Sequence, residues 1–354
     1  MSEPAPFHVP TVDIGAYVSG GDEADRLAAA TAFDEAARTV GFVQVTGHGI
    51  PVEVTDAFAA ALDGFFGLPP EAKRAYRTPP EVNRGYAPPK TESLSLSLGL
   101  APANRMHDFF EAFNVGAAVS DYPGLDLPEE DYPENVWPAE AEGFREAVTA
   151  YYDEAARVAR TMTAMFADAL GLPAGFFARY TDHSLDVLRM NNYALEPGEI
   201  ELDGDLTGMG EHTDYGIVTV LWADQVRGLQ VLGRDGGWHD VLPADGALLI
   251  NLGDLMARWT NDRWMSTLHR VKPPVVDGRI ERRRSAAFFH DGNVDAVIET
   301  LPTCLDVTND GAFSSPYPPI TVGGHIRAKL AGSRAGVANT EAEREAARVL
   351  TARG

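Results

Sequence analysis

The chain has 354 residues, of which 45% are hydrophobic and 23% are charged, a composition typical of a globular protein. Its 29 basic and 52 acidic residues give a net charge of −23, which argues against nucleic-acid binding because an acidic surface repels phosphates. The single cysteine, Cys304, excludes an intrachain disulfide and a thiolate metal cage. We expect a cytoplasmic protein with no membrane partner, because the sequence shows neither an export signal nor a run of about 18 apolar residues.

The first half of the chain carries mostly helical patterns. Apolar spacing predicts helices over residues 23–40 and from Pro51 onward, separated by a short strand at 42–46. A longer helix is predicted over 138–170. The Pro-, Gly- and Ser-rich stretch 78–136 is interpreted as loops with few fixed elements.

The second half changes to short strands. Between residues 185 and 298, β-branched and aromatic runs alternate with turns at intervals of roughly 8–12 residues, which is typical of a sandwich or barrel. The expected strands are 187–193, 216–222, 228–232, 247–251, 266–272 and 285–290. The Ala/Glu/Arg-rich tail, 335–353, predicts a terminal helix. These patterns favour an α+β fold.

We expect one structural unit made of three consecutive regions. A helical and strand region over 1–184 precedes a barrel core over 185–300, and an extension with a terminal helix follows over 301–354. Neither internal repeats nor a Gly/Ser-rich linker divides the chain.

A candidate metal motif lies in the second half. His212 and Asp214 stand two residues apart, so on an extended segment both side chains leave the same face and can bind one ion. Alone this pair is weak evidence, because nine histidines and 52 carboxylates give about one such pair by chance, often as a surface salt link. His269 supplies a third ligand. Two histidines and one carboxylate form the facial triad typical of non-haem Fe(II) oxygenases, which leaves positions open for a chelating cosubstrate and dioxygen.

Ten segments carry a resemblance to a known family. The first half contains GFVQVTGHGIP, RGYAPP and DFFEAFNVG, and the second half contains LRMNNY, GEHTDYG, GLQV, LLINLGD, TNDRWMSTLHRV, RRSAAFFHDGN and YPPITVGG. Over nearly its whole length the chain resembles the Fe(II)/2-oxoglutarate-dependent dioxygenases of the isopenicillin N synthase-like group. The resemblance implies a double-stranded β-helix, or jelly roll, wrapped by N-terminal and C-terminal helices.

The resemblance also implies cofactors and a reaction. His212, Asp214 and His269 match the family's iron ligands, although His269 alone would be read as a core histidine. The cosubstrates implied are 2-oxoglutarate and O2, with ascorbate as a reductant. In the implied reaction 2-oxoglutarate becomes succinate and CO2 while a small organic substrate is hydroxylated, with desaturation or ring closure as variants.

Arg283 and Ser285 match the family's Arg-x-Ser motif, which holds the distal carboxylate of 2-oxoglutarate. A guanidinium forms two charge-assisted hydrogen bonds with a carboxylate, and the hydroxyl adds a third. The neighbouring Arg282 and Arg284 make a basic surface patch the competing interpretation. Strand periodicity favours Arg283, because it shares a face with Ser285 and Phe289.

Four further positions are candidates for contacts with the cosubstrate or the substrate. Asn191 and Tyr193 match family positions that hydrogen-bond 2-oxoglutarate, although Tyr193 is equally suited to fill the barrel. Arg189 shares their strand face and is expected either to bind a substrate carboxylate or to form a surface salt bridge. Phe289 matches a position at which some members stack an aromatic substrate, and core packing is its other interpretation.

Two alternatives to this function stay open at the level of sequence. Isopenicillin N synthase and aminocyclopropane-carboxylate oxidase carry the Arg-x-Ser motif without using 2-oxoglutarate, so a cosubstrate-independent oxidase is one alternative. A non-catalytic ligand-binding protein on the same scaffold is the other. We expect the substrate to contact the stretch 84–113, the strand around Arg189 and the terminal helix, and the uncharged stretch 93–99 favours an apolar or aromatic substrate.

Overall fold

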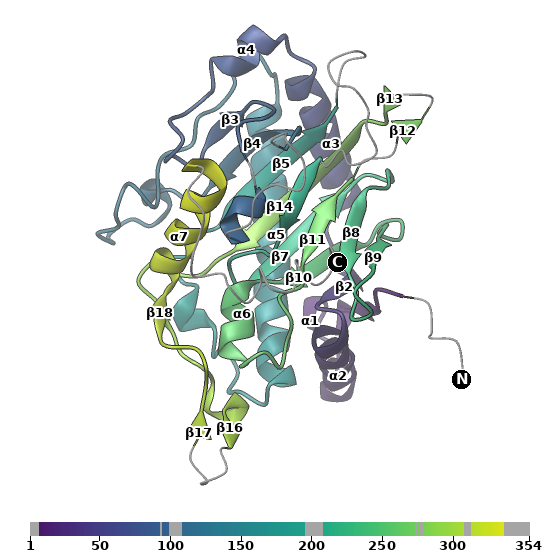
Figure 1. The fold of residues 1–354 in the computed structure, drawn as a ribbon, viewed down its shortest axis with the longest axis vertical. Helices are drawn as coiled ribbons and strands as arrows, with labels where there is room; N and C mark the ends of the chain where they lie inside the picture. The colour runs from purple at the N-terminus through teal and green to yellow at the C-terminus, as the bar shows by residue number, and fades with distance from the viewer. Residues whose placement is uncertain are drawn as a thin grey trace.

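An eight-stranded sheet runs through the centre of the molecule (Figure 1). The computed structural model describes residues 7–92, 94–98, 108–194, 208–272, 275–276, 279–307 and 313–335. In spatial order the strands of this large sheet are β1 (Thr11–Asp13), β2 (Phe42–Thr46), β10 (Leu248–Leu252), β7 (Val218–Ala223), β14 (Arg283–His290), β5 (Val187–Tyr193), β4 (Glu111–Gly116) and β3 (Gly85–Ala87). All neighbours pair antiparallel except β1 and β2, which are parallel.

A four-stranded sheet faces the large one. Its order is β6 (Met209–His212), β11 (His269–Val271), β8 (Leu229–Leu232) and β9 (Trp238–Asp240). Three two-stranded ladders complete the described strands: β12 (Val275–Val276) with β13 (Arg279–Ile280), β15 (Val297–Ile298) with β18 (Ile320–Thr321), and β16 (Asp306–Val307) with β17 (Phe313–Ser314). The two larger sheets form the jelly roll expected from the sequence, which agrees with the structural relatives described below.

Helices cover the outer face of the large sheet and one edge of the jelly roll. They are α1 (Gly15–Val18), α2 (Glu23–Thr39), α3 (Val52–Phe66), α4 (Pro70–Arg74), α5 (Phe144–Ala169), α6 (Asp254–Trp259) and α7 (Val322–Ala335). Single 3-10 turns occur at η1 (Leu94–Leu98), η2 (Val119–Asp121), η3 (Ala178–Tyr180) and η4 (Pro302–Cys304). In the described part of the chain, none of the helices combines the length and apolarity needed to span a bilayer.

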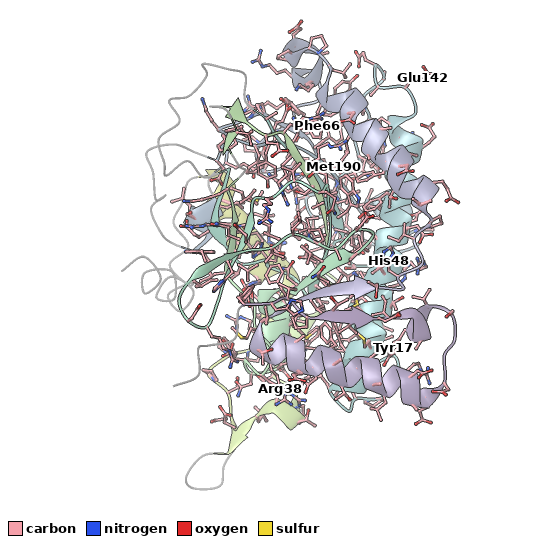
Figure 2. All side chains as sticks on the ribbon, turned by 90° about the vertical axis from the view of Figure 1, so that its right-hand side faces the viewer. Tyr17, Arg38, His48, Phe66, Glu142 and Met190 are labelled. Atoms are coloured by element: carbon pink, nitrogen blue, oxygen red, sulfur yellow. The ribbon has the colours of Figure 1, made fainter. Side chains whose placement is uncertain are left out.

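The main core lies between the large sheet and α5. Apolar residues of α5 recur at helical spacing and are fully buried, and Tyr151 stacks on Phe58 of α3 with ring centroids 4.0 Å apart. Phe288 of β14 packs edge-on against Tyr152 of α5 at 5.0 Å. Figure 2 shows side chains filling this interior around Met190. The buried area makes the large sheet a rigid platform for the residues on its other face.

Alternation along β14 separates the core from the inner cavity. Ala286 and Phe288 pack into the helix-facing core, whereas Arg283, Ser285 and Phe289 line the space between the two sheets. Because side chains alternate along a strand, every second residue of β14 faces that space. The strand periodicity used in the sequence analysis therefore has the correct register.

Several predicted elements agree with the structure and others differ. The strands predicted at 42–46 and 187–193 have the bounds of β2 and β5. The stretch 78–136 was predicted as loops with few fixed elements, but it contains β3 and β4, because the apolar run before Gly116 pairs with the distant β5. The long helix begins at Phe144 rather than at residue 138. The terminal helix predicted over 335–353 lies outside the described residues, except that α7 ends at Ala335.

We expect Gly41→Ala to lower the free energy of unfolding by about 2–5 kcal/mol, the sum of a left-handed backbone cost and a packing cost. Gly41 links α2 to β2 with a φ of +72°, and a Cβ there would overlap Thr267 Oγ1 and the Met265 carbonyl oxygen. Gly20→Ala is the matched control, since its φ is +79° but its Cβ would meet nothing within 4 Å. Urea denaturation measures both, and equal losses would contradict the packing argument.

Candidate metal centre and cosubstrate pocket

A cavity lies between the two sheets, and polar and apolar side chains from both sheets line it. Strands β5, β7 and β14 form one wall, strands β6, β8 and β11 form the opposite wall, and α7 closes one side. The apolar lining includes Leu221, Leu229 and Val271. Such a lining excludes water from the few polar groups and so strengthens their electrostatic interactions.

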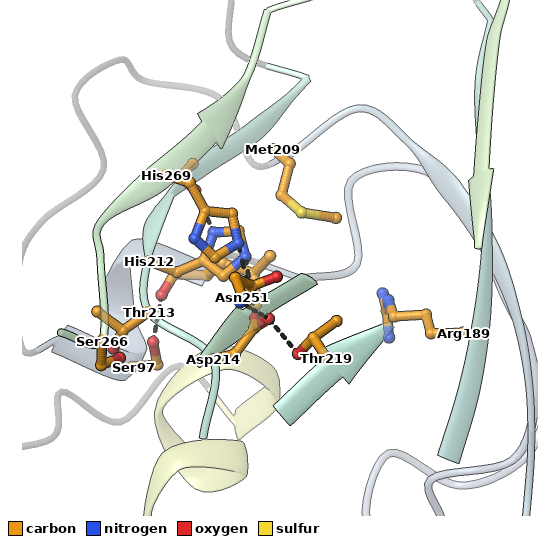
Figure 3. Close-up of polar contacts among 12 residues, drawn as sticks. Ser97, Arg189, Met209, His212, Thr213, Asp214, Thr219, Asn251, Ser266 and His269 are labelled. Atoms are coloured by element: carbon orange, nitrogen blue, oxygen red, sulfur yellow. Dashed lines mark hydrogen bonds and ion pairs between the residues drawn. The ribbon is translucent and has the colours of Figure 1, made fainter. Parts of the chain in front are cut away.

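The three candidate ligands meet at one point of this cavity. His212 ends β6 and His269 begins β11, and the two residues are directly paired across the small sheet. Asp214 follows β6, and its Oδ1 lies 3.8 Å from His212 Nε2 and 3.6 Å from His269 Nε2. One ligand atom from each residue lies within 4.8 Å of the others, and all three side chains are buried (Figure 3).

Backbone hydrogen bonds orient both imidazoles toward this point. His212 Nδ1 lies 2.8 Å from the Gly210 carbonyl oxygen, and His269 Nδ1 lies 3.0 Å from the Thr267 carbonyl oxygen. A carbonyl oxygen can only accept, so each Nδ1 carries the proton and each Nε2 presents a lone pair. Burial and the adjacent His269 lower the pKa of His212 to about 3, which keeps its ring neutral near pH 7.

The Asp214 carboxylate is held on one oxygen and open on the other. Its Oδ2 accepts hydrogen bonds from Thr219 Oγ1 and, at 2.6 Å, from Asn251 Nδ2. Its Oδ1 faces the two histidines (Figure 3). Two neutral imidazole nitrogens and one carboxylate oxygen, with no thiolate, are a donor set suited to non-haem Fe(II). The residues present therefore fit the iron centre expected from the sequence.

Arg283 is a buried cation without an anion. Its side chain is 2% exposed, its Nη1 donates to Ser285 Oγ at 3.1 Å, and its guanidinium lies over the Tyr193 ring at 5.3 Å. Its Nε has no hydrogen-bond partner, and no carboxylate among the described residues forms an ion pair with it. An unpaired buried charge is unfavourable, so the pocket fits an anionic ligand such as a carboxylate.

Asn191 and Tyr193 complete this end of the cavity. The register pairs Asn191 with Ser285 and Tyr193 with Arg283 across β5 and β14, and all four residues line the cavity. Burial raises the pKa of Tyr193 to about 12, so its hydroxyl stays protonated and can donate a hydrogen bond. The structure thus brings together the four residues to which the resemblance assigned the cosubstrate.

The two flanking arginines point away from the cavity. Arg282 and Arg284 both form ion pairs with Asp63 of α3, at 2.7 and 2.8 Å, and Arg284 also pairs with Asp224. Their guanidinium groups are therefore neutralised on the helix-facing side of β14. Only Arg283 of this arginine run lines the cavity.

The two candidate substrate residues also line the cavity. Arg189 forms an ion pair with Glu92 at 2.7 Å and lies over the Phe110 ring at 5.0 Å. The salt bridge considered for Arg189 thus exists, but it is buried rather than on the surface. Phe289 is partly exposed and lines the cavity, whereas its neighbour Phe288 is the one that packs in the core.

A buried ion pair next to the ligands was not predicted from the sequence. Asp254 Oδ2 lies 2.7 Å from Lys329 Nζ of α7 and accepts from Thr213 Oγ1 at 3.2 Å, and the Asp254 backbone N–H donates to the Asp214 carbonyl oxygen at 2.9 Å. Burial opposes ionisation of Asp254, but Lys329 and His325 outweigh burial and lower its pKa below the usual range. No periodic pattern links Asp254 to a lysine so distant in the sequence.

Because the pair connects α7 to the loop that carries Asp214, we expect Lys329→Met to lower the free energy of unfolding by about 3–5 kcal/mol, the usual cost of leaving a buried charge unpaired. Arg327→Met on the same helix is the matched control. Arg327 pairs with Asp131 at 2.8 Å but is largely exposed, so its loss should cost less than about 1 kcal/mol. Chemical denaturation compares the two, and similar losses would show that the ion pair does not anchor α7.

Comparison with known proteins identifies two matching families. Residues 9–140 match the family described as non-haem dioxygenase in morphine synthesis N-terminal, and residues 185–292 match the 2OG-Fe(II) oxygenase superfamily. The chain is 34% identical over 330 residues to the 2-oxoglutarate-Fe(II) type oxidoreductase hxnY of Emericella nidulans, covering 91% of this chain and 89% of that protein. It is 35% identical over 327 residues to validamycin A dioxygenase of Streptomyces hygroscopicus subsp. limoneus, covering 91% and 85%.

Solved structures show the same fold. A full-length Neurospora crassa protein in complex with alpha-KG and thymine superposes with a TM-score of 0.78 at 28% identity, covering 94% of this chain and 98% of that chain. JOX2 in complex with 2OG, Fe and JA gives 0.70 at 25% identity, covering 93% and 87%. These relatives favour the 2-oxoglutarate-dependent branch over the cosubstrate-independent one. The chain belongs to the 2OG-Fe(II) oxygenase superfamily, and it is a dioxygenase that uses Fe(II), 2-oxoglutarate and O2 to oxidise a small organic molecule.

Proposed function

We propose that this dioxygenase holds Fe(II) through His212, Asp214 and His269 and hydroxylates a small substrate bound beside them. The strongest support is that the other polar atoms of these three side chains already form hydrogen bonds within the protein. Both Nδ1 atoms and Asp214 Oδ2 are engaged in protein hydrogen bonds, so one free donor atom per residue converges on the same point. A site with this arrangement is organised before the metal arrives.

We propose further that 2-oxoglutarate places its distal carboxylate on Arg283 and Ser285, with Asn191 and Tyr193 as additional hydrogen-bonding groups. The unpaired guanidinium supports this, because a carboxylate would supply the anion that the described residues do not. The cation and the hydroxyl fix the orientation of the bound acid.

When bound, the iron and 2-oxoglutarate supply the chemistry that activates O2 toward a C–H bond. The protein contributes position and a dry environment. Asp214, held by Thr219 and Asn251, keeps its orientation, and the apolar wall around Leu221 and Leu229 excludes water.

We propose that Arg189 and Phe289 contact the substrate. Both side chains line the cavity, Arg189 from β5 and Phe289 from β14. Along these paired strands, both residues lie farther from Arg283 than Ser285 does. Because Arg189 is already paired with Glu92, it offers a polar but neutralised surface rather than a free cation. The relatives are named for different compounds, among them validamycin A, gibberellin and proline, so their names do not converge on one substrate.

We expect His269→Ala to abolish the conversion of 2-oxoglutarate to succinate and to lower Fe(II) occupancy, because two ligands hold iron less firmly than three. Anaerobic Fe(II) titration and succinate assays in air measure both. His239→Ala is the matched control: His239 lies on β9 of the same sheet, where its ring hydrogen-bonds Asp235 and stacks on Phe7. Retained turnover in His269→Ala would overturn the triad assignment.

We expect Arg283→Gln to weaken 2-oxoglutarate binding by a factor on the order of 10² to 10³, corresponding to the roughly 3–5 kcal/mol lost when a buried ion pair is broken. Anaerobic titration of the Fe(II)-loaded protein, followed by the metal-to-ligand absorption band, gives the affinity. Iron binding should hardly change. Arg284→Gln is the control, since this side chain pairs with Asp63 and Asp224 outside the cavity. Weakening by Arg284→Gln alone would contradict the proposed cosubstrate site.

A further inference from the structure

A buried carboxyl group lies at the end of the cavity opposite the cosubstrate pocket. Asp291 directly follows β14, is 8% exposed and lines the cavity that contains the three candidate iron ligands. It has no hydrogen-bond or ion-pair partner among the described residues. Because Asp291 faces the cavity rather than a protein partner, its carboxyl oxygens are open to a molecule bound there.

The fold makes room for this carboxyl group with a glycine. A Cβ at position 216 would overlap Asp291 Oδ1, so Gly216 allows the side chain to lie against the loop that carries Asp214. The same glycine is crowded from the other side, because a Cβ at Gly253 would overlap the Gly216 carbonyl oxygen. The packing thus holds Asp291 at a fixed position next to the metal centre.

The charges around Asp291 do not satisfy it. Its charged neighbours, Asp186 and Asp214, are both acidic. Of the two arginines that line the cavity, Arg189 pairs with Glu92, and Arg283 stands eight residues back along the strand, roughly 26 Å for extended chain. A hydrogen-bond donor or a cation placed here would therefore gain a strong interaction.

We propose that Asp291 determines substrate specificity by accepting a hydrogen bond from a hydroxyl or protonated amine of the substrate. This inference rests on the proposed function, because it places the substrate beside the iron site. The apolar part of the substrate then packs between Phe289 of β14 and Ile326 and Leu330 of α7, which line the same cavity. A substrate carboxylate at this position is disfavoured because it would add a further acidic group beside Asp291, Asp186 and Asp214.

Three aromatic probes that differ only in the polar group test the proposal: benzylamine, benzyl alcohol and benzoate. The protein is first loaded anaerobically with Fe(II) and 2-oxoglutarate, and the metal-to-ligand absorption band confirms loading. Isothermal titration calorimetry then gives the affinity of each probe. We expect benzylamine and benzyl alcohol to bind and benzoate to bind at least tenfold more weakly.

Variants of Asp291 separate the charge from the acceptor oxygen. Asp291→Asn keeps the volume and an acceptor oxygen, so it should weaken benzylamine about tenfold to a hundredfold but benzyl alcohol by less than about threefold. Asp291→Ala should weaken both, and either change should improve binding of benzoate. Asp295→Asn is the control, because Asp295 is an exposed carboxylate that pairs with His183 outside the cavity.

Failure of this inference about Asp291 can be distinguished from failure of the proposed function. If the absorption band does not form, the iron and cosubstrate assignments fail before any probe is added. If the band forms but benzoate binds best, neither donor probe binds, or the Asp291 variants bind all probes as the wild type does, the inference is wrong. Retained 2-oxoglutarate affinity in Asp291→Asn shows that a changed probe affinity does not result from misfolding.

Discussion

The hydrogen bonds that Thr219 and Asn251 donate to Asp214 fix the carboxylate on which the metal centre depends. These two donors are a directly opposed pair on β7 and β10 of the large sheet, whereas His212 and His269 are an opposed pair on β6 and β11 of the small sheet. The site is therefore assembled from one cross-strand pair of each sheet, joined through the loop that carries Asp214. Any slip in either register would separate the donor atoms, because shifting a strand by one residue turns its side chains to the other face. The geometry of the metal centre thus depends on the same strand registers that close the jelly roll.

Strand β14 arranges the chemistry along a single direction. Arg283 and Ser285 stand at its beginning, Phe289 near its end and Asp291 just beyond it, and all four line the cavity. Because alternate residues of a strand face the same side, one strand presents a cationic end, an apolar stretch and an acidic end to the same space. This order supports a cosubstrate and a substrate that approach the metal centre from opposite ends. The opposite face of β14 is packed against α5, so the positions along it are held rigidly.

Local patterns predicted those parts of the molecule that depend on periodicity. The bounds of β2 and β5 and the face shared by Arg283 and Ser285 follow from alternation, and the order of the motifs led to the fold and the cofactors. Strand β4 was missed because its place in the sheet comes from pairing with β5, not from its own turn-rich surroundings. Asn251 was not among the candidate site residues of the sequence analysis, yet its amide contacts a candidate iron ligand. The pairing of Asp254 with Lys329 joins distant segments through one polar contact, for which a single sequence contains no signal.

Arg283 and Asp291 place a cation and a carboxyl group in one cavity, yet the two do not pair with each other. The rigid strand keeps them apart, so each retains hydrogen-bonding capacity for a bound molecule, and the unpaired Arg283 guanidinium lowers the stability of the free protein. Apolar residues of similar volume at both positions would remove that cost, but they would also remove the groups proposed to orient the two small molecules. When an anionic cosubstrate binds at one end and a hydrogen-bond donor at the other, the buried groups gain partners. The free energy of these new interactions contributes to the affinity and orientation of both molecules. The net charge of −23 makes this selective, because an acidic protein that attracts few anions elsewhere concentrates its anion recognition on the buried Arg283.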